Sequence, residues 1–184
     1  MNVTDHHFTC RDGLELHARS LGEGTRTLLC LPGLARTARD FDELAAHVPA
    51  DWRLLCPDHR GRGRSDRDPR PNRYHTVTYA EDALEWLDHL GLERIVVLGT
   101  SFGGWVALTL AARNPDRVSG VILNDIGVTV PREAALQYME RMARRPTPAE
   151  VDPAFNRQMG QARRWAPFLG VLCRLGLMRH SAPL

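Results

Sequence analysis

The sequence of 184 residues contains no lysine, because all 24 of its basic residues are arginine. A Walker loop needs a lysine to reach the phosphates of a nucleotide, and a Schiff base needs a lysine amine. Both enzyme classes are therefore excluded. No apolar run reaches the roughly 18 residues of a membrane helix, and the first residues lack the pattern of a secretory signal. We therefore expect a cytoplasmic protein with no membrane partner.

Cysteine is also scarce, and its spacing carries no metal or redox motif. The four cysteines, at positions 10, 30, 56 and 173, form no C-x-x-C pair. We expect reduced, mostly buried thiols, no metal site and no cofactor. The net charge of +2 and the 43% hydrophobic content suit a soluble globular domain with a sizeable core.

Short apolar runs that end at proline, glycine or aspartate alternate with amphipathic segments. Such runs are typical of parallel strands covered on both faces. The pair Asp12-Gly13 indicates a hairpin turn between two earlier strands, over residues 8–11 and 14–20. The sequence thus predicts an α/β fold with a doubly wound, mostly parallel sheet and an antiparallel N-terminal hairpin.

Three helices are expected between these strands. The first carries an apolar stripe at positions 41, 44, 45 and 48, and the second begins at a capping box formed by Thr78 and Glu81. The third, over residues 105–112, is apolar almost all round, so we expect it to be the most deeply buried. From Pro131 onward the strand pattern stops. We therefore expect a core of six strands over residues 1–130 and a partial helical cap or tail over residues 131–184.

The stretch LGTSFGG, residues 98–104, places Ser101 between glycines at the junction of an apolar strand and an apolar helix. A sharp turn there strains the serine backbone and leaves no space for side chains at Gly99 and Gly103. The turn exposes the serine hydroxyl and aims the Phe102 amide at a developing negative charge. The amide of Leu34, after another strand end, is the expected second donor of an oxyanion hole.

Four segments together, LPGLARTARDF, CPDHRGRGRSD, LGTSFGGWVA and VILNDIG, resemble the α/β-hydrolase superfamily over residues 14–130. The resemblance implies that Ser101 is a nucleophile, that Leu34 and Phe102 supply the oxyanion donors, and that a cap follows the sixth strand. Pro32 stands where histidine is commoner in the family, which leaves the backbone donor of Leu34 intact.

The family order of the triad is serine, acid, histidine, with the acid and the histidine usually after the seventh and eighth strands. No such strands are visible here, so we expect a C-terminally truncated hydrolase. Asp125, after the sixth strand, is the candidate acid, or else it caps the turn there. His59 and His180 are weaker candidates for a base, and His59 is expected instead to bond to backbone.

Two functions remain open. The first is a serine hydrolase that cleaves an ester, lactone, amide or C–C bond of a small apolar substrate by acyl transfer through Ser101. The alternative is a catalytically incomplete fragment, or a non-enzymatic binding remnant, that lacks the triad histidine. In either case the unpaired edge of the sixth strand favours self-association.

Two further interpretations are disfavoured. A dinucleotide-binding loop needs glycine at the position of Ser101. The arginine-rich stretch of residues 57–73 contains interspersed aspartates and no stacking aromatic residues, so we interpret it as a self-paired surface loop and not as a nucleic-acid site.

Overall fold

A computed structural model describes residues 2–126 and residue 133 of the chain. The chain divides into two units between residues 126 and 127, and the first unit holds the described fold. The expected cap over residues 131–184 lies outside the described residues, apart from Glu133. No helix in the part of the chain that the structure describes is long and apolar enough to cross a membrane.

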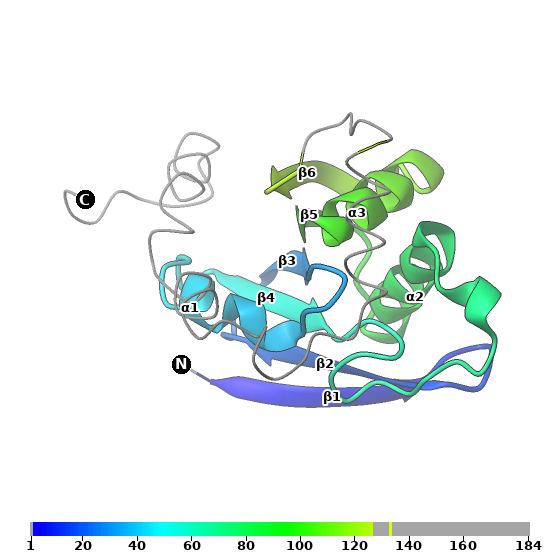
Figure 1. Ribbon diagram of the computed structural model, residues 1–184. Helices are drawn as coiled ribbons and strands as arrows, with labels where there is room; N and C mark the ends of the chain where they lie inside the picture. The colour runs from blue at the N-terminus through cyan, green and yellow to red at the C-terminus, as the bar shows by residue number, and fades with distance from the viewer. Residues whose placement is uncertain (1, 127–132, 134–184) are drawn as a thin grey trace, which may run out of the picture. The chain divides into compact units, whose positions relative to one another are not determined.

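The first unit contains a six-stranded sheet in the order β1-β2-β4-β3-β5-β6 (Figure 1). The strands are β1 (Val3–Thr9), β2 (Glu15–Leu21), β3 (Arg26–Leu31), β4 (Trp52–Pro57), β5 (Ile95–Thr100) and β6 (Val118–Asn124). The strands β4, β3, β5 and β6 run parallel to one another, whereas β2 runs antiparallel to both β1 and β4. The predicted doubly wound sheet with an antiparallel N-terminal hairpin is confirmed.

The hairpin turn falls at the predicted pair of residues. Gly13 adopts a φ of +88°, which glycine tolerates and other residues rarely adopt. The first strand, however, is longer than expected: β1 begins at Val3, and its register pairs Val3 with Leu21. Most of β1 is exposed to solvent, so its residues carry no apolar pattern that could have revealed the strand.

The helical elements are η1 (Ala38–Phe41), α1 (Asp42–Ala45), η2 (Pro71–Arg73), α2 (Thr76–His89) and α3 (Phe102–Arg113). The helices α2 and α3 pack against each other on one face of the sheet, and α1 lies on the other face (Figure 1). The helix expected from the apolar stripe at positions 41 to 48 is shorter than predicted, because α1 ends at Ala45.

Two expectations about the helices are wrong. The capping box at Thr78 does not form, because α2 begins earlier and the side chain of His75 accepts the Thr78 amide as N-cap. The third helix is not the most deeply buried: seven residues of α2 are buried against five of α3. Trp105, on α3, is 42% exposed.

The core lies mainly between the sheet and the α2–α3 pair. Trp86 and Leu87 of α2 and Leu110 of α3 are fully buried there against β3 and β5. Burial of a side chain of this size contributes about 2 kcal/mol. Cys10, Cys30 and Cys56 are buried free thiols, as expected, and Cys173 lies outside the described residues.

Candidate active site

Ser101 occupies the sharp turn between β5 and α3. Its backbone has a φ of +51° and a ψ of −118°, a conformation that L-residues other than glycine rarely adopt. Such a residue stores about 1–3 kcal/mol of strain and persists only where its surroundings hold it. The Ser101 amide donates to Asn124 O at 2.8 Å, which ties the turn to the end of β6. The Ser101 hydroxyl makes no hydrogen bond within residues 2–126 and is only partly buried.

The glycines that flank Ser101 stand where the backbones come too close for a side chain. A Cβ added at Gly99 would lie 2.6 Å from the carbonyl carbon of Gly103 and 2.5 Å from the Cα of Gly104. A Cβ added at Gly103 would lie 2.7 Å from Pro32 O and closer still to Leu31 O. Real Cβ atoms essentially never come within 3.0 Å of such atoms. The steric reason for the G-x-S-x-G pattern is therefore present in this fold.

Two backbone amides lie beside the Ser101 turn. Phe102 is the first residue of α3, so its amide has no acceptor within the helix and sits at the positive end of the helix dipole. Gly33 is in direct proximity to the serine, because a Cβ at Gly33 would lie 3.8 Å from Ser101 Cβ. Leu34 follows it in a turn closed by the Arg36 amide, which donates to Gly33 O at 3.0 Å. Leu34 and Phe102 thus come from two different chain segments that lie beside Ser101.

His59 bonds to backbone, which was the expected alternative to its role as a base. Its Nε2 donates to Pro32 O at 3.1 Å, and its side chain is buried against Tyr79 and Phe102. Burial lowers the pKa of His59 to about 4. The imidazole is consequently neutral near pH 7, with its Nε2 proton engaged by a carbonyl.

Asp125 follows the last residue of β6. Its backbone is left-handed, with a φ of +57°, which aspartate tolerates better than most residues. Its side chain is exposed and has no hydrogen-bond partner within residues 2–126. The preceding Asn124 contacts the Ser101 turn through its carbonyl, and its side-chain amide donates to Thr100 Oγ1 at 3.2 Å. Asp125 thus follows directly on a residue that bonds to the serine turn, and its role as the acid stays a prediction. His180 lies outside the described residues.

Most arginines of the loop after β4 pair with carboxylates, as predicted. The pairs are not confined to a surface loop, however, because one of the arginines is buried and binds carboxylates from other parts of the chain. Arg60 is 1% exposed and bonds to Asp68 within the loop, at 2.7 Å, and to two distant residues. These are Asp82 of α2, at 2.7 Å, and Asp12 of the first hairpin, at 2.9 Å. Sequence reasoning missed this cluster because two of its carboxylates lie 22 and 48 residues from Arg60 in the chain.

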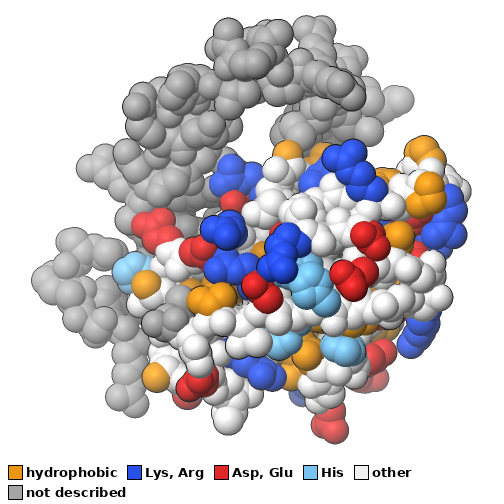
Figure 2. Space-filling view, turned by 90° about the horizontal axis from the view of Figure 1, so that it is seen from below, with side chains coloured by type: hydrophobic (Ala, Val, Ile, Leu, Met, Phe, Trp, Pro, Cys, Tyr) orange, Lys and Arg blue, Asp and Glu red, His pale blue; other side chains and the backbone are white. Residues whose placement is uncertain are grey.

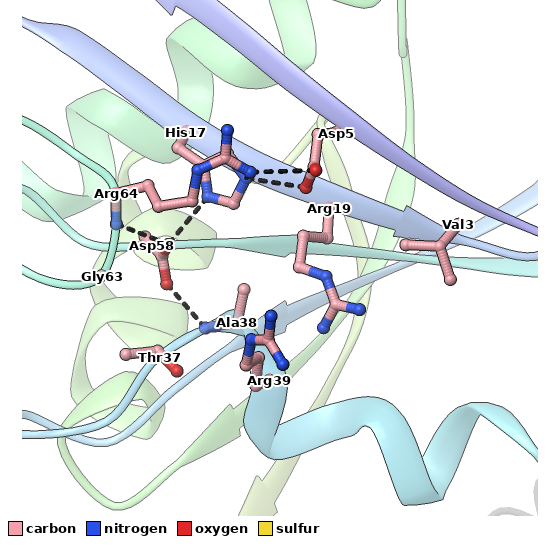
Figure 3. Close-up of a pocket in the computed structure, with 10 residues that line it drawn as sticks. All are labelled: Val3, Asp5, His17, Arg19, Thr37, Ala38, Arg39, Asp58, Gly63 and Arg64. Carbon is pink, nitrogen blue, oxygen red and sulfur yellow. Dashed lines mark hydrogen bonds and ion pairs between the residues drawn. The ribbon is translucent and has the colours of Figure 1, made fainter.

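A cavity of about 410 Å³ lies over β1 and β2, and Ser101 is not among its lining residues (Figure 3). His17 is one of the lining residues, with Nδ1 at 2.7 Å from Asp58 Oδ2 and Nε2 at 2.9 Å from Asp5 Oδ1. Asp58 also accepts the amides of Ala38 and Arg64. These bonds join β2 to the loops after β3 and β4, and no hydrogen bond connects them to Ser101 within residues 2–126. We therefore assign this set a structural role.

The surface seen from the β1 edge carries basic, acidic and histidine side chains side by side (Figure 2). Arg64 pairs with Asp5 at 2.9 Å, and His7 lies 3.3 Å from Glu15. Within residues 2–126 and residue 133, no three His, Cys, Asp or Glu side chains are placed to hold a metal ion.

Comparison with known proteins agrees with the fold. Residues 26–175 match the family described as alpha/beta hydrolase fold. The chain is 39% identical over 102 residues to the 3-hydroxybutyrate-oligomer hydrolase of Cupriavidus necator, a match that covers 55% of this chain and 35% of that protein. It is 40% identical over 86 residues to the 2-hydroxymuconate semialdehyde hydrolase of Pseudomonas putida, with 46% of this chain and 30% of that protein covered.

Solved structures give the same result. An alpha/beta hydrolase from Novosphingobium aromaticivorans shares 44% identity and a TM-score of 0.69, over 76% of this chain and 49% of that one. The chain thus spans between about a third and a half of the length of these relatives. The family match covers most of the sequence, and the solved structure shares the fold. This chain therefore belongs to the alpha/beta hydrolase family.

Proposed function

We propose that this chain provides the nucleophile and the oxyanion hole of a serine hydrolase. The reaction would cleave an ester, lactone, amide or C–C bond of a small, largely apolar substrate by acyl transfer through Ser101. The observation that carries the proposal is the strained backbone of Ser101, held beside Gly33 at the amino end of α3. Strain at a single, partly buried serine needs a functional reason, because an unstrained turn would be more stable.

Four residues have proposed roles. The Ser101 hydroxyl attacks the substrate carbonyl, and a base removes its proton. The amides of Leu34 and Phe102 donate to the oxyanion that develops on the carbonyl oxygen, and loss of one such donor lowers turnover by about 10²–10³. Asp125 is the proposed acid. We assign no residue among 2–126 as the base.

The relatives support hydrolysis more strongly than they support a particular substrate. Their names refer to a hydroxybutyrate oligomer and to a muconate semialdehyde. A third protein of similar fold, at 25% identity and a TM-score of 0.61, is an N-acyl homoserine lactonase. These bonds differ, but each can be cleaved by attack of a nucleophile on a carbonyl group. We therefore leave the proposal at the level of the bond classes named above.

One observation favours the alternative of a catalytically incomplete fragment. Within residues 2–126, no histidine bonds to the Ser101 hydroxyl, and the buried imidazole of His59, which contacts the neighbouring Phe102, donates its Nε2 proton to Pro32 O. A serine without its base retains only the acceleration given by binding and by the oxyanion hole.

Labelling with a fluorophosphonate probe tests the proposal. We expect stoichiometric labelling of the full chain and its loss in Ser101→Ala. Ser119→Ala is the matched control, because Ser119 is a serine of β6 that donates to Ile95 O and lies outside the site. Folded protein that takes up no probe would support the incomplete fragment and reject the proposed function.

A further inference from the structure

Three consecutive carbonyls of the loop beside Ser101 are each held by a hydrogen bond. Pro32 O accepts from His59 Nε2 at 3.1 Å, and Gly33 O accepts from the Arg36 amide at 3.0 Å. Leu34 O accepts from Arg62 Nε at 2.6 Å. Two of the three donors are therefore side chains of the loop that follows β4.

These bonds fix the direction of the Leu34 amide. A trans peptide is planar, so the N–H of Leu34 points opposite to the carbonyl of Gly33 in the same peptide unit. The Arg36 amide holds that carbonyl, and His59 and Arg62 hold the peptide units on either side. Rotation of the central peptide would break at least one of these bonds. The Leu34 amide itself has no acceptor within residues 2–126, so it is free to bind a ligand.

His59 also contacts the second proposed donor residue. Its ring centroid lies 6.0 Å from that of Phe102 and 4.8 Å from that of Tyr79, in edge-to-face arrangements. Tyr79 in turn lies 5.2 Å from Phe102. Burial raises the pKa of Tyr79 to about 12, so this cluster is uncharged near pH 7. One imidazole thus connects the segment of Leu34 to the start of α3.

Arg62 has no role as an ion-pair partner in the described residues. Its guanidinium donates only to backbone, to Leu34 O and to Gly61 O at 3.0 Å. Most arginines of the same loop, in contrast, pair with carboxylates, as Arg60 and Arg70 do. A guanidinium that donates to two backbone carbonyls, and to no carboxylate among the described residues, is suited to hold a backbone segment in place.

We infer that His59 and Arg62 are positioning residues that preorganise the Leu34 amide as an oxyanion donor. The inference rests on the proposed function, since it concerns the same site. Neither side chain touches the substrate in this account. Their removal should therefore lower the rate of the chemical step and leave the binding of substrate or probe unchanged. A displacement of about 1 Å in such a site can reduce the rate by about 10².

The test uses four variants of the full chain. His59→Leu and Arg62→Met remove the donors, His59→Gln keeps an amide donor in a similar place, and Arg67→Met removes an exposed arginine of the same loop as control. Fluorophosphonate labelling at several probe concentrations separates the maximal labelling rate from probe affinity. We expect the maximal rate to fall between about 10-fold and 100-fold in His59→Leu and Arg62→Met. Affinity should stay within about twofold, and His59→Gln should recover most of the rate.

Hydrogen exchange at the Leu34 amide provides a readout that is independent of chemistry. We expect faster exchange in Arg62→Met and His59→Leu than in the wild type and in Arg67→Met. If His59→Leu does not fold, Arg62→Met and His59→Gln decide the matter.

The outcomes distinguish this inference from the proposed function. Wild-type labelling at Ser101 with unchanged rates in Arg62→Met and His59→Leu would overturn the inference alone. A wild type that takes up no probe would reject the proposed function. In that case equal exchange at Leu34 in all variants would also overturn the inference, and faster exchange in the two donor-lacking variants would support it.

Discussion

Gly103 is the position where the fold and the proposed site depend most directly on each other. In Gly103→Ala the new methyl group would lie 2.7 Å from Pro32 O and closer to Leu31 O. Both atoms belong to backbone, and neither can rotate away as a side chain would. Helix α3 and the β3 end must therefore separate by a distance on the order of 1 Å.

Two quantities follow from that separation. Overpacking of this kind costs typically about 1–3 kcal/mol, and we expect the upper part of that range because backbone must move. The same movement carries Phe102 and Ser101 away from Leu34, so the rate of Ser101 labelling should fall about 100-fold. Urea denaturation gives the change in the free energy of unfolding, and the fluorophosphonate probe gives the rate.

Gly120→Ala is the matched control. Gly120 lies in β6 with no atom within 4 Å of an added Cβ, and its φ is not in the left-handed region. We expect Gly120→Ala to be neutral or up to about 1 kcal/mol more stable than the wild type, with unchanged labelling. A Gly103→Ala variant that matches Gly120→Ala in both stability and labelling rate would refute the reasoning.

Four further predictions concern strain, pH, the buried ion pairs and the sheet edge. Ser101→Gly should be about 1 kcal/mol more stable than Ser101→Ala in urea, because glycine adopts a φ of +51° with little strain; equal stability would argue against strain. The folded pKa of His59 is about 4, below the usual 6.5, so its contribution to stability is complete above pH 6.5 and is lost as the pH falls toward 4. Between pH 6.5 and pH 4, the free energy of unfolding should fall by about 3 kcal/mol less in His59→Gln than in the wild type. Arg60→Met should cost about 3–5 kcal/mol by urea denaturation because it leaves the buried Asp82 carboxylate unpaired, whereas Arg67→Met should stay within about 0.5 kcal/mol. Strand β6 pairs only with β5 in residues 2–126, so sedimentation velocity should show self-association that increases with concentration; a monodisperse monomer at all concentrations would contradict this.

Those parts of the fold that depend on short-range sterics could be predicted from the sequence. The turn at Gly13 and the serine turn are examples, because each requires glycine at fixed positions for reasons of backbone conformation or close approach. Apolar runs likewise located β3 and β5, since strands buried on both faces leave a continuous apolar pattern.

Other features could not be predicted, because they depend on residues distant in the chain or on competing local signals. The partners of Arg60 come from the first hairpin and from α2, and no local pattern indicates either. The start of α2 was misplaced because Thr78 and Glu81 have the spacing of a capping box, whereas His75 provides the cap. The exposure of Trp105 shows that an apolar residue in a helix does not by itself report burial.

The central claim is that the Ser101 turn aims a nucleophile at two backbone amides. The most direct measurement is a crystal structure of the protein after reaction with a phosphonate probe. The account predicts a covalent bond at Ser101 Oγ and a phosphonyl oxygen about 2.7–3.1 Å from the nitrogens of both Leu34 and Phe102. An adduct whose oxygens contact neither amide, or an unmodified Ser101, would contradict it.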